Sequence, residues 1–152
     1  MSVLLIGVPP EIAEILIPRL VSEGDEVRVL ERDEAISERW RVLGAYLAGG
    51  TNWDADLIER AAQNVRTLVL GGAHSEDPAS FSAEVIEGAR LASREMRVVL
   101  LDPPDGVVEL MRGSSLDYVA LFAPRRGLLR RGTSVAPLHV AEAIDAADDL
   151  SG

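Results

Sequence analysis

The stretch VLLIGVPP, residues 3–10, places a short apolar run before a glycine and two prolines. A continuous apolar run of this length is typical of a strand that is buried on both faces of a parallel sheet. Apolar residues then recur at the spacing of one helix face, at Ile12, Ile15, Leu16 and Leu20. The stretch therefore predicts a strand, a tight turn and a helix, the first half of a βαβ unit.

The same alternation continues along the rest of the chain. Further strands are expected at residues 26–30, 45–48, 67–70, 98–101 and 117–122. Further helices are expected at residues 37–43, 54–63, 77–95, 107–112 and 140–149. Strands and helices that alternate at this spacing predict an α/β fold, a three-layer doubly wound Rossmann-like parallel sheet. Because 152 residues suit one hydrophobic core, we expect a single domain over residues 1–152.

The composition excludes several kinds of chemistry. The sequence has no cysteine and no lysine, so all 15 basic residues are arginine. Disulfides, a catalytic thiol, Schiff-base chemistry and a P-loop lysine are therefore excluded. With two histidines, a metal site made of histidines alone is not expected. A net charge of −10 argues against nucleic acid or an anionic membrane as a partner. Neither a secretory signal nor a membrane-spanning apolar run is seen, so we expect a cytoplasmic protein.

Three stretches carry a family resemblance: LERD at residues 30–33, ELMRGSSLDY at 109–118 and VAPLHVAEAI at 135–144. With them the sequence resembles the atypical short-chain dehydrogenase/reductases, the NmrA-like group of NAD(P)-binding Rossmann proteins. The first half resembles a regulatory nucleotide-binding domain of potassium-transport proteins comparably, whereas the second half favours the reductases. The resemblance implies a short, degenerate NAD(P)-binding Rossmann domain, with NAD or NADP as its cofactor.

The glycine motif implied by the resemblance is incomplete. Members of the family place a Gly-x-x-Gly-x-x-Gly turn after the first strand, where backbone N–H groups approach the pyrophosphate. Here Gly7 is kept, but Pro10 and Ala13 occupy the second and third glycine positions. Pro10 and Pro9 both lack an N–H, and the ring of Pro10 fills space that the phosphate needs. The alternative interpretation is a purely structural strand–helix turn.

Two further places match the implied cofactor site. Glu31 stands where a Rossmann acid binds the ribose hydroxyls, and Arg32 stands where an arginine meets the 2′-phosphate of NADP. The alternative for both is a solvated turn. Gly71 and Gly72, after the expected fourth strand, would let a ligand approach the backbone, or would simply close a tight strand end.

The catalytic pattern of the family is missing. Its enzymes use a tyrosine whose pKa is lowered by a lysine, whereas this chain has no lysine and both tyrosines, Tyr46 and Tyr118, fall in expected strands. His74 and Asp102 are the remaining candidates, since both are expected at the carboxyl edge of the sheet. A solvent-exposed loop histidine and a turn-forming aspartate are the alternatives. No metal ligand set is expected.

Four arginines cluster between Arg125 and Arg131 and could serve a subunit interface, a solvated loop or an anionic ligand. The interpretation favoured by the sequence is a non-catalytic nucleotide-binding or regulatory protein that forms a homodimer. One alternative is an NAD(P)-dependent reductase or isomerase with a non-standard active site. A second alternative is a structural oligomer subunit that binds no nucleotide.

Overall fold

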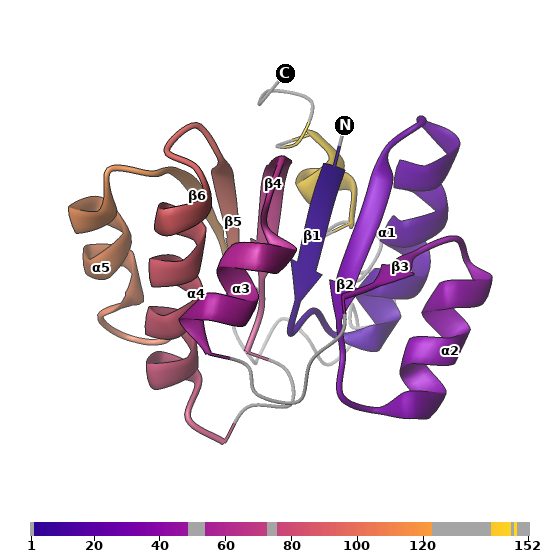
Figure 1. Ribbon diagram of the computed structural model, residues 1–152, viewed down its shortest axis with the longest axis horizontal. Coiled ribbons are helices and arrows are strands. Elements are labelled where there is room, and N and C mark those ends of the chain that lie inside the picture. The colour runs from indigo at the N-terminus through magenta and orange to yellow at the C-terminus, as the bar shows by residue number, and fades with distance from the viewer. Residues whose placement is uncertain (1, 49–53, 73–75, 123–140, 147, 149–152) are drawn as a thin grey trace.

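The described strands form one parallel sheet in the order β3-β2-β1-β4-β5-β6 (Figure 1). The computed structural model describes residues 2–48, 54–72, 76–122, 141–146 and 148. Its strands are β1 (Ser2–Ile6), β2 (Glu26–Leu30), β3 (Tyr46–Leu47), β4 (Val65–Leu70), β5 (Arg97–Leu101) and β6 (Asp117–Leu121). The strand order reverses between β1 and β4, as in a doubly wound fold.

Helices cover both faces of the sheet. They are α1 (Pro10–Ser22), α2 (Glu34–Val42), α3 (Ala55–Ala61), α4 (Pro78–Ala92) and α5 (Val107–Ser114), and residues 141–146 are also helical. One buried cluster joins the sheet to α1, α2 and residues 141–146, and the other joins it to α3, α4 and α5 (Figure 1). The predicted three-layer α/β architecture is confirmed.

The central strand β1 packs against the helices on both faces of the sheet. Val3, Leu4, Leu5 and Ile6 have no exposed surface. Because successive side chains of a strand point to opposite faces, Val3 and Leu5 join the α1 side while Leu4 and Ile6 join the α3 side. Full burial of each such side chain contributes about 1.5 to 3 kcal/mol to stability.

Aspartate caps set the starts of three helices. Asp33, Asp54 and Asp77 accept hydrogen bonds from the amides of Ile36, Leu57 and Ser80, at 3.1, 3.0 and 3.2 Å. The helix expected at 37–43 therefore begins earlier, at Glu34, directly after its cap. The helix expected at 77–95 ends earlier, at Ala92, because Ser93 is extended.

Ion pairs of two buried carboxylates attach residues 145 and 148 to α1 and to β4. The carboxylate of Asp148 accepts hydrogen bonds from Thr67 Oγ1 at 2.7 Å and from Arg66 Nη2 at 2.6 Å. Asp145 accepts one from Arg19 Nε of α1 at 2.6 Å. Asp145 and Asp148 are both buried, so these contacts hold the two residues against α1 and β4.

Within the described ranges, every helix is too short or too polar to cross a bilayer.

Candidate functional site

The carboxyl edge between β1 and β4 is the place where a doubly wound sheet forms its ligand crevice. Gly7 follows β1 with a left-handed φ of 64°, and Gly71 follows β4. The Gly71 amide donates to the Ile6 carbonyl at 2.8 Å, and a Cβ atom on Gly71 would lie 2.4 Å from the Gly7 carbonyl oxygen. Two of the predicted site glycines are thus neighbours, and the contact between their backbones requires glycine at position 71.

Gly72 is under less constraint than Gly71. A Cβ atom there would meet only the side chain of Pro78, at 3.4 Å, which is ordinary packing distance.

The first turn of α1 offers few N–H groups to an anion. Pro9 is the N-cap and makes no side-chain capping bond, and Pro10 is the first helical residue. The amides of Ile12 and Ala13 both donate to the Pro9 carbonyl at 3.0 Å. Of the first three helical residues, only Glu11 keeps an N–H that is not directed to that carbonyl, whereas a phosphate-binding helix usually presents several.

Glu31, the acid that was predicted to bind ribose, forms hydrogen bonds within the turn that follows β2. Glu31 Oε1 accepts hydrogen bonds from the amides of Arg32 and Asp33, both at 3.0 Å. Glu31 is half-buried and Arg32 is exposed. These bonds order the turn and engage the carboxylate that was predicted to bind ribose.

Asp102 lies at the carboxyl edge, directly after β5. Its φ of 43° is left-handed, a conformation that costs energy in a residue other than glycine. Its amide donates to the Leu121 carbonyl at 2.8 Å, which ties the end of β5 to the end of β6. The exposed side chain of Asp102 is therefore presented on the side of the sheet where ligands bind.

Neither of the two tyrosines belongs to a helix. Tyr46 is in β3, and Tyr118 is in β6, where its hydroxyl accepts a hydrogen bond from Arg112 Nε at 3.3 Å. Neither is placed for the tyrosine chemistry of the reductases, which carry that residue on a helix.

Several predicted site residues lie outside the described residues: His74 and the arginines Arg125, Arg126, Arg130 and Arg131. In the ranges that are described, no group of three histidines or acids could hold a metal ion.

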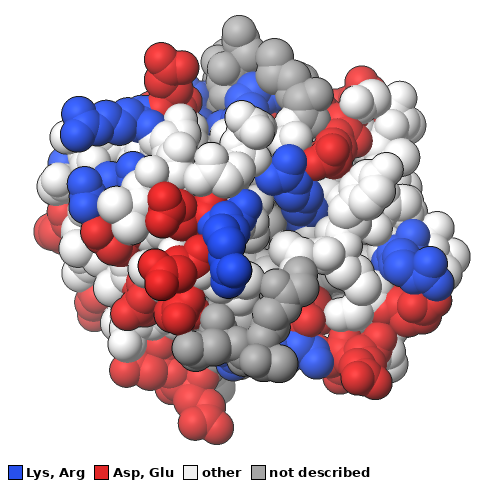
Figure 2. Space-filling view, in the orientation of Figure 1, with Lys and Arg blue, Asp and Glu red and all other residues white. Residues whose placement is uncertain are grey.

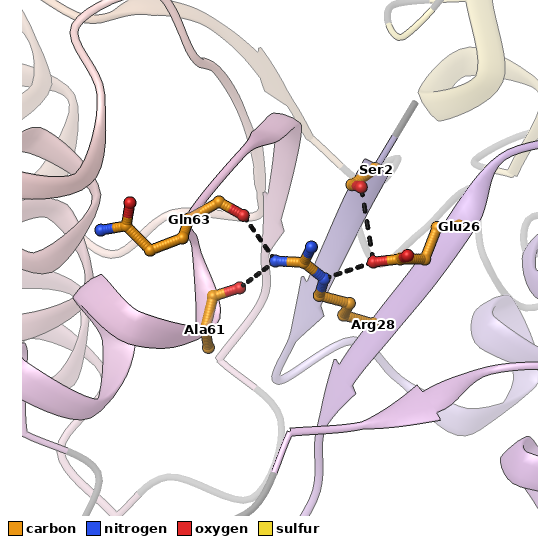
Figure 3. Close-up of polar contacts among 5 residues, drawn as sticks. All are labelled: Ser2, Glu26, Arg28, Ala61 and Gln63. Atoms are coloured by element: carbon orange, nitrogen blue, oxygen red, sulfur yellow. Dashed lines mark hydrogen bonds and ion pairs between the residues drawn. The ribbon is translucent and has the colours of Figure 1, made fainter.

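Sequence reasoning missed a polar cluster on the sheet face beside α3 (Figure 3). Arg28 Nη1 donates to the Ala61 and Gln63 carbonyls at 3.0 and 2.6 Å, and Nε donates to Glu26 at 2.6 Å. Arg28 thereby satisfies carbonyls at the end of α3 that the helix itself leaves open. The available signal was an arginine in a strand position whose neighbours on the same face, such as Leu4, are buried.

The sequence matches no protein-family model and no curated protein. Its structure, however, is similar to solved structures of NAD(P)-dependent enzymes. A protein from Corynebacterium glutamicum assigned to the short-chain dehydrogenase/reductases aligns with a TM-score of 0.72 and 15% identity, over 98% of this chain and 92% of that chain. A protein from Bacillus halodurans assigned to the NAD-dependent epimerase/dehydratases gives 0.59 and 19%, over 79% and 68%.

A triphenylmethane reductase from Citrobacter sp., solved with NADP(H), gives a TM-score of 0.64 and 12% identity, over 91% of this chain and 55% of that chain. This chain thus spans about half the length of that reductase. At these identities the likeness establishes the fold alone, a doubly wound Rossmann-like fold that those enzymes share. The resemblance suggested by the sequence is confirmed at that level.

Proposed function

We propose that this chain binds a nucleotide at the carboxyl edge between β1 and β4 and serves a regulatory role without turning over a substrate. The contact between Gly7 and Gly71 carries the proposal. At the point where the strand order reverses, this contact holds the ends of β1 and β4 close together with no side chain on either glycine, so a ligand can approach the backbone. NAD or NADP is the proposed ligand, because solved structures with this fold hold NADPH or NAD+.

The turn before α1 argues for weak binding. With prolines at positions 9 and 10, the helix N-terminus supplies fewer hydrogen bonds to a pyrophosphate. A mononucleotide, which needs fewer phosphate contacts, is therefore a useful second probe.

The absence of turnover rests on residue chemistry. The chain has no lysine to lower the pKa of a tyrosine, and its two tyrosines lie in β3 and β6. The general acid of the reductases and its partner therefore have no counterpart.

One observation favours a second candidate, an NAD(P)-dependent reductase or isomerase with a non-standard active site. Asp102 has a left-handed backbone at the carboxyl edge, and strained residues cluster at functional sites. In that enzyme Asp102 or His74 would transfer the proton.

Binding and turnover are separated by two measurements on the same protein. Thermal unfolding with NAD+, NADH, NADP+, NADPH or ADP should show a raised midpoint for at least one ligand, since a ligand that binds the native state stabilises it. No shift at millimolar concentrations would overturn the proposal. Oxidation of a bound reduced cofactor that depends on Asp102 would instead support the enzyme.

A homodimer, a single domain over residues 1–152 and a cytoplasmic location are further parts of the proposal. The edge strand β3 and the end of α2 expose apolar side chains: Val42, Tyr46 and Leu47 are 76, 65 and 43% exposed. An edge strand also presents unpaired backbone groups to a second strand. Sedimentation should give a dimer that Leu47→Lys dissociates, and a monomeric wild-type protein would contradict this part.

A further inference from the structure

A hollow lies on the sheet face beside α3, away from the contact between Gly7 and Gly71. Its volume is about 360 Å³, and it is lined by Arg28, Ala48, Leu57, Arg60 and Ala61. Arg28 is the middle residue of β2 and pairs in register with Leu4 and Tyr46. The hollow therefore lies over β2, near the β3 edge of the sheet, and neither Gly7 nor Gly71 lines it.

Arg28 is held in a fixed orientation. Its Nη1 group donates hydrogen bonds to the Ala61 and Gln63 carbonyls, and its Nε group donates one to the Glu26 carboxylate (Figure 3). Within the described residues, its Nη2 group has no hydrogen-bond partner. A guanidinium that is already fixed loses little conformational entropy when its remaining donors bind an anion.

Arg60 supplies a second positive charge from the last turn of α3. It is exposed and forms no ion pair with any residue that the structure describes. Most arginines of the described ranges pair with a carboxylate, whereas the charge of Arg60 is left available to a ligand. Figure 2 shows basic side chains near the centre of the view, between acidic side chains on the left and uncharged surface on the right.

The other lining residues are apolar. Leu57 and Ala61 are buried in α3, and Ala48 is half-buried after β3. Tyr46, which pairs with Arg28, is largely exposed near the same place. The hollow thus combines donors for an anion with a surface for an apolar body.

We propose that this hollow binds a small amphipathic carboxylate, whose charge meets Arg28 and Arg60 and whose apolar body packs on Leu57, Ala61 and Ala48. A guanidinium binds a carboxylate through charge-assisted hydrogen bonds. A singly charged carboxylate fits better than a phosphate dianion, because the Glu26 carboxylate lies 2.6 Å from Arg28 Nε and repels additional negative charge. The proposal is independent of nucleotide binding.

Benzoate is a suitable probe, with benzamide as its neutral isostere and inorganic phosphate as an anion without an apolar body. Titration of the ¹⁵N-labelled protein should shift the amides of Ala48, Leu57 and Ala61 with benzoate. Arg60→Gln should weaken that binding about five- to tenfold, since one partly screened charge-assisted contact is lost. Arg94→Gln, which removes an exposed arginine elsewhere, should leave the binding unchanged.

The proposal is overturned if millimolar benzoate leaves these amides unmoved, or if Arg60→Gln binds it as tightly as the wild type. Equal binding of benzamide or of phosphate would also overturn it, since the charge or the apolar body would then be irrelevant. Arg60 is exposed, so its replacement tests the hollow without threatening the fold.

Discussion

Gly71 lies so close to Gly7 that a Cβ atom on Gly71 would stand 2.4 Å from the Gly7 carbonyl oxygen and 3.1 Å from its carbonyl carbon. The Gly71 amide also donates to the Ile6 carbonyl at 2.8 Å. The obstructing atoms belong to the backbone, so no side-chain rotation can relieve the contact. The two ends of β1 and β4 therefore approach only because residue 71 has no side chain.

Gly71→Ala should accordingly destabilise the protein by about 1 to 3 kcal/mol, because the strand ends must separate to admit the methyl group. The free energy of unfolding by urea measures the effect. Gly113→Ala is the matched control, since a Cβ atom on Gly113 in α5 meets nothing within 4 Å. Alanine is the better helix former, so the control should gain up to about 1 kcal/mol. Equal stability of Gly71→Ala and the wild type would contradict the observed contact.

The packing of α3 on α4 depends on Gly88. A Cβ atom there would lie 2.6 Å from Ile58 Cβ and 2.8 Å from the Ala55 carbonyl oxygen. Although alanine favours a helix, Gly88→Ala should lower the free energy of unfolding by about 1 to 3 kcal/mol, since α3 must shift away from α4. The same urea series provides the measurement, with Gly113→Ala again as the control. A stabilised Gly88→Ala protein would show that the two helices are farther apart.

Asp25 gives a pH-dependent prediction. Burial and then the charge of Asp148 raise the pKa of Asp25 above 3.8, and the lowering effect of Arg66, 3.6 Å away, does not compensate. The folded state therefore keeps this proton to a higher pH than the unfolded state, and stability is lost as the pH rises from about 4 through the folded pKa.

The Asp25→Asn variant has no carboxyl group to ionise at this position, so it does not lose this stability as the pH rises. Its free energy of unfolding, relative to the wild type at the same pH, should increase between about pH 3 and about pH 7. Urea unfolding of both proteins at the two pH values measures the difference. A relative stability that falls with rising pH would mean that ionised Asp25 is favourable in the folded protein.

Pro10 is expected to limit nucleotide affinity. Pro10→Gly restores an N–H at the first helical position and removes the ring, so dinucleotide binding should tighten about three- to tenfold, the effect of one charge-assisted hydrogen bond. The variant should lose up to about 1 kcal/mol of stability, because glycine has more freedom in the unfolded chain. Calorimetric titration with NADPH and NADH measures the affinity.

Pro18→Ala is the control for that experiment. Pro18 lies on the exposed side of α1 and lacks a helical hydrogen bond. Its replacement should stabilise the protein and leave nucleotide affinity unchanged. If Pro10→Gly and the wild type bind the dinucleotides with equal affinity, Pro10 does not limit nucleotide binding.

The fold was predicted well from the sequence because a strand buried on both faces of a parallel sheet can be recognised from its own apolar residues. The apolar run at residues 3–6 needed no knowledge of distant residues to be recognised as a central strand. Helix ends were predicted less well: the composition suggested a start at Ser37, whereas the cap at Asp33 begins the helix at Glu34.

The site was harder to predict because its contacts join residues that are distant along the chain. Gly71 was recognised as a candidate, but its need to be glycine comes from Gly7, on another strand. Likewise, only the folded chain places Asp148 against Thr67 and Arg66, or turns Arg28 toward the end of α3. The resemblance located Glu31, yet the bonds within its turn depend on local backbone geometry.

Nucleotide binding at the carboxyl edge is tested most directly by titrating the ¹⁵N-labelled protein with NADH and NADPH while following its amide resonances. The predicted result is a saturable shift of the Gly7, Glu11, Glu31 and Gly71 amides at concentrations up to the millimolar range, with the cofactor left unoxidised. Amides that stay unmoved at saturating concentration, or shifts confined to another face of the sheet, would contradict the proposal.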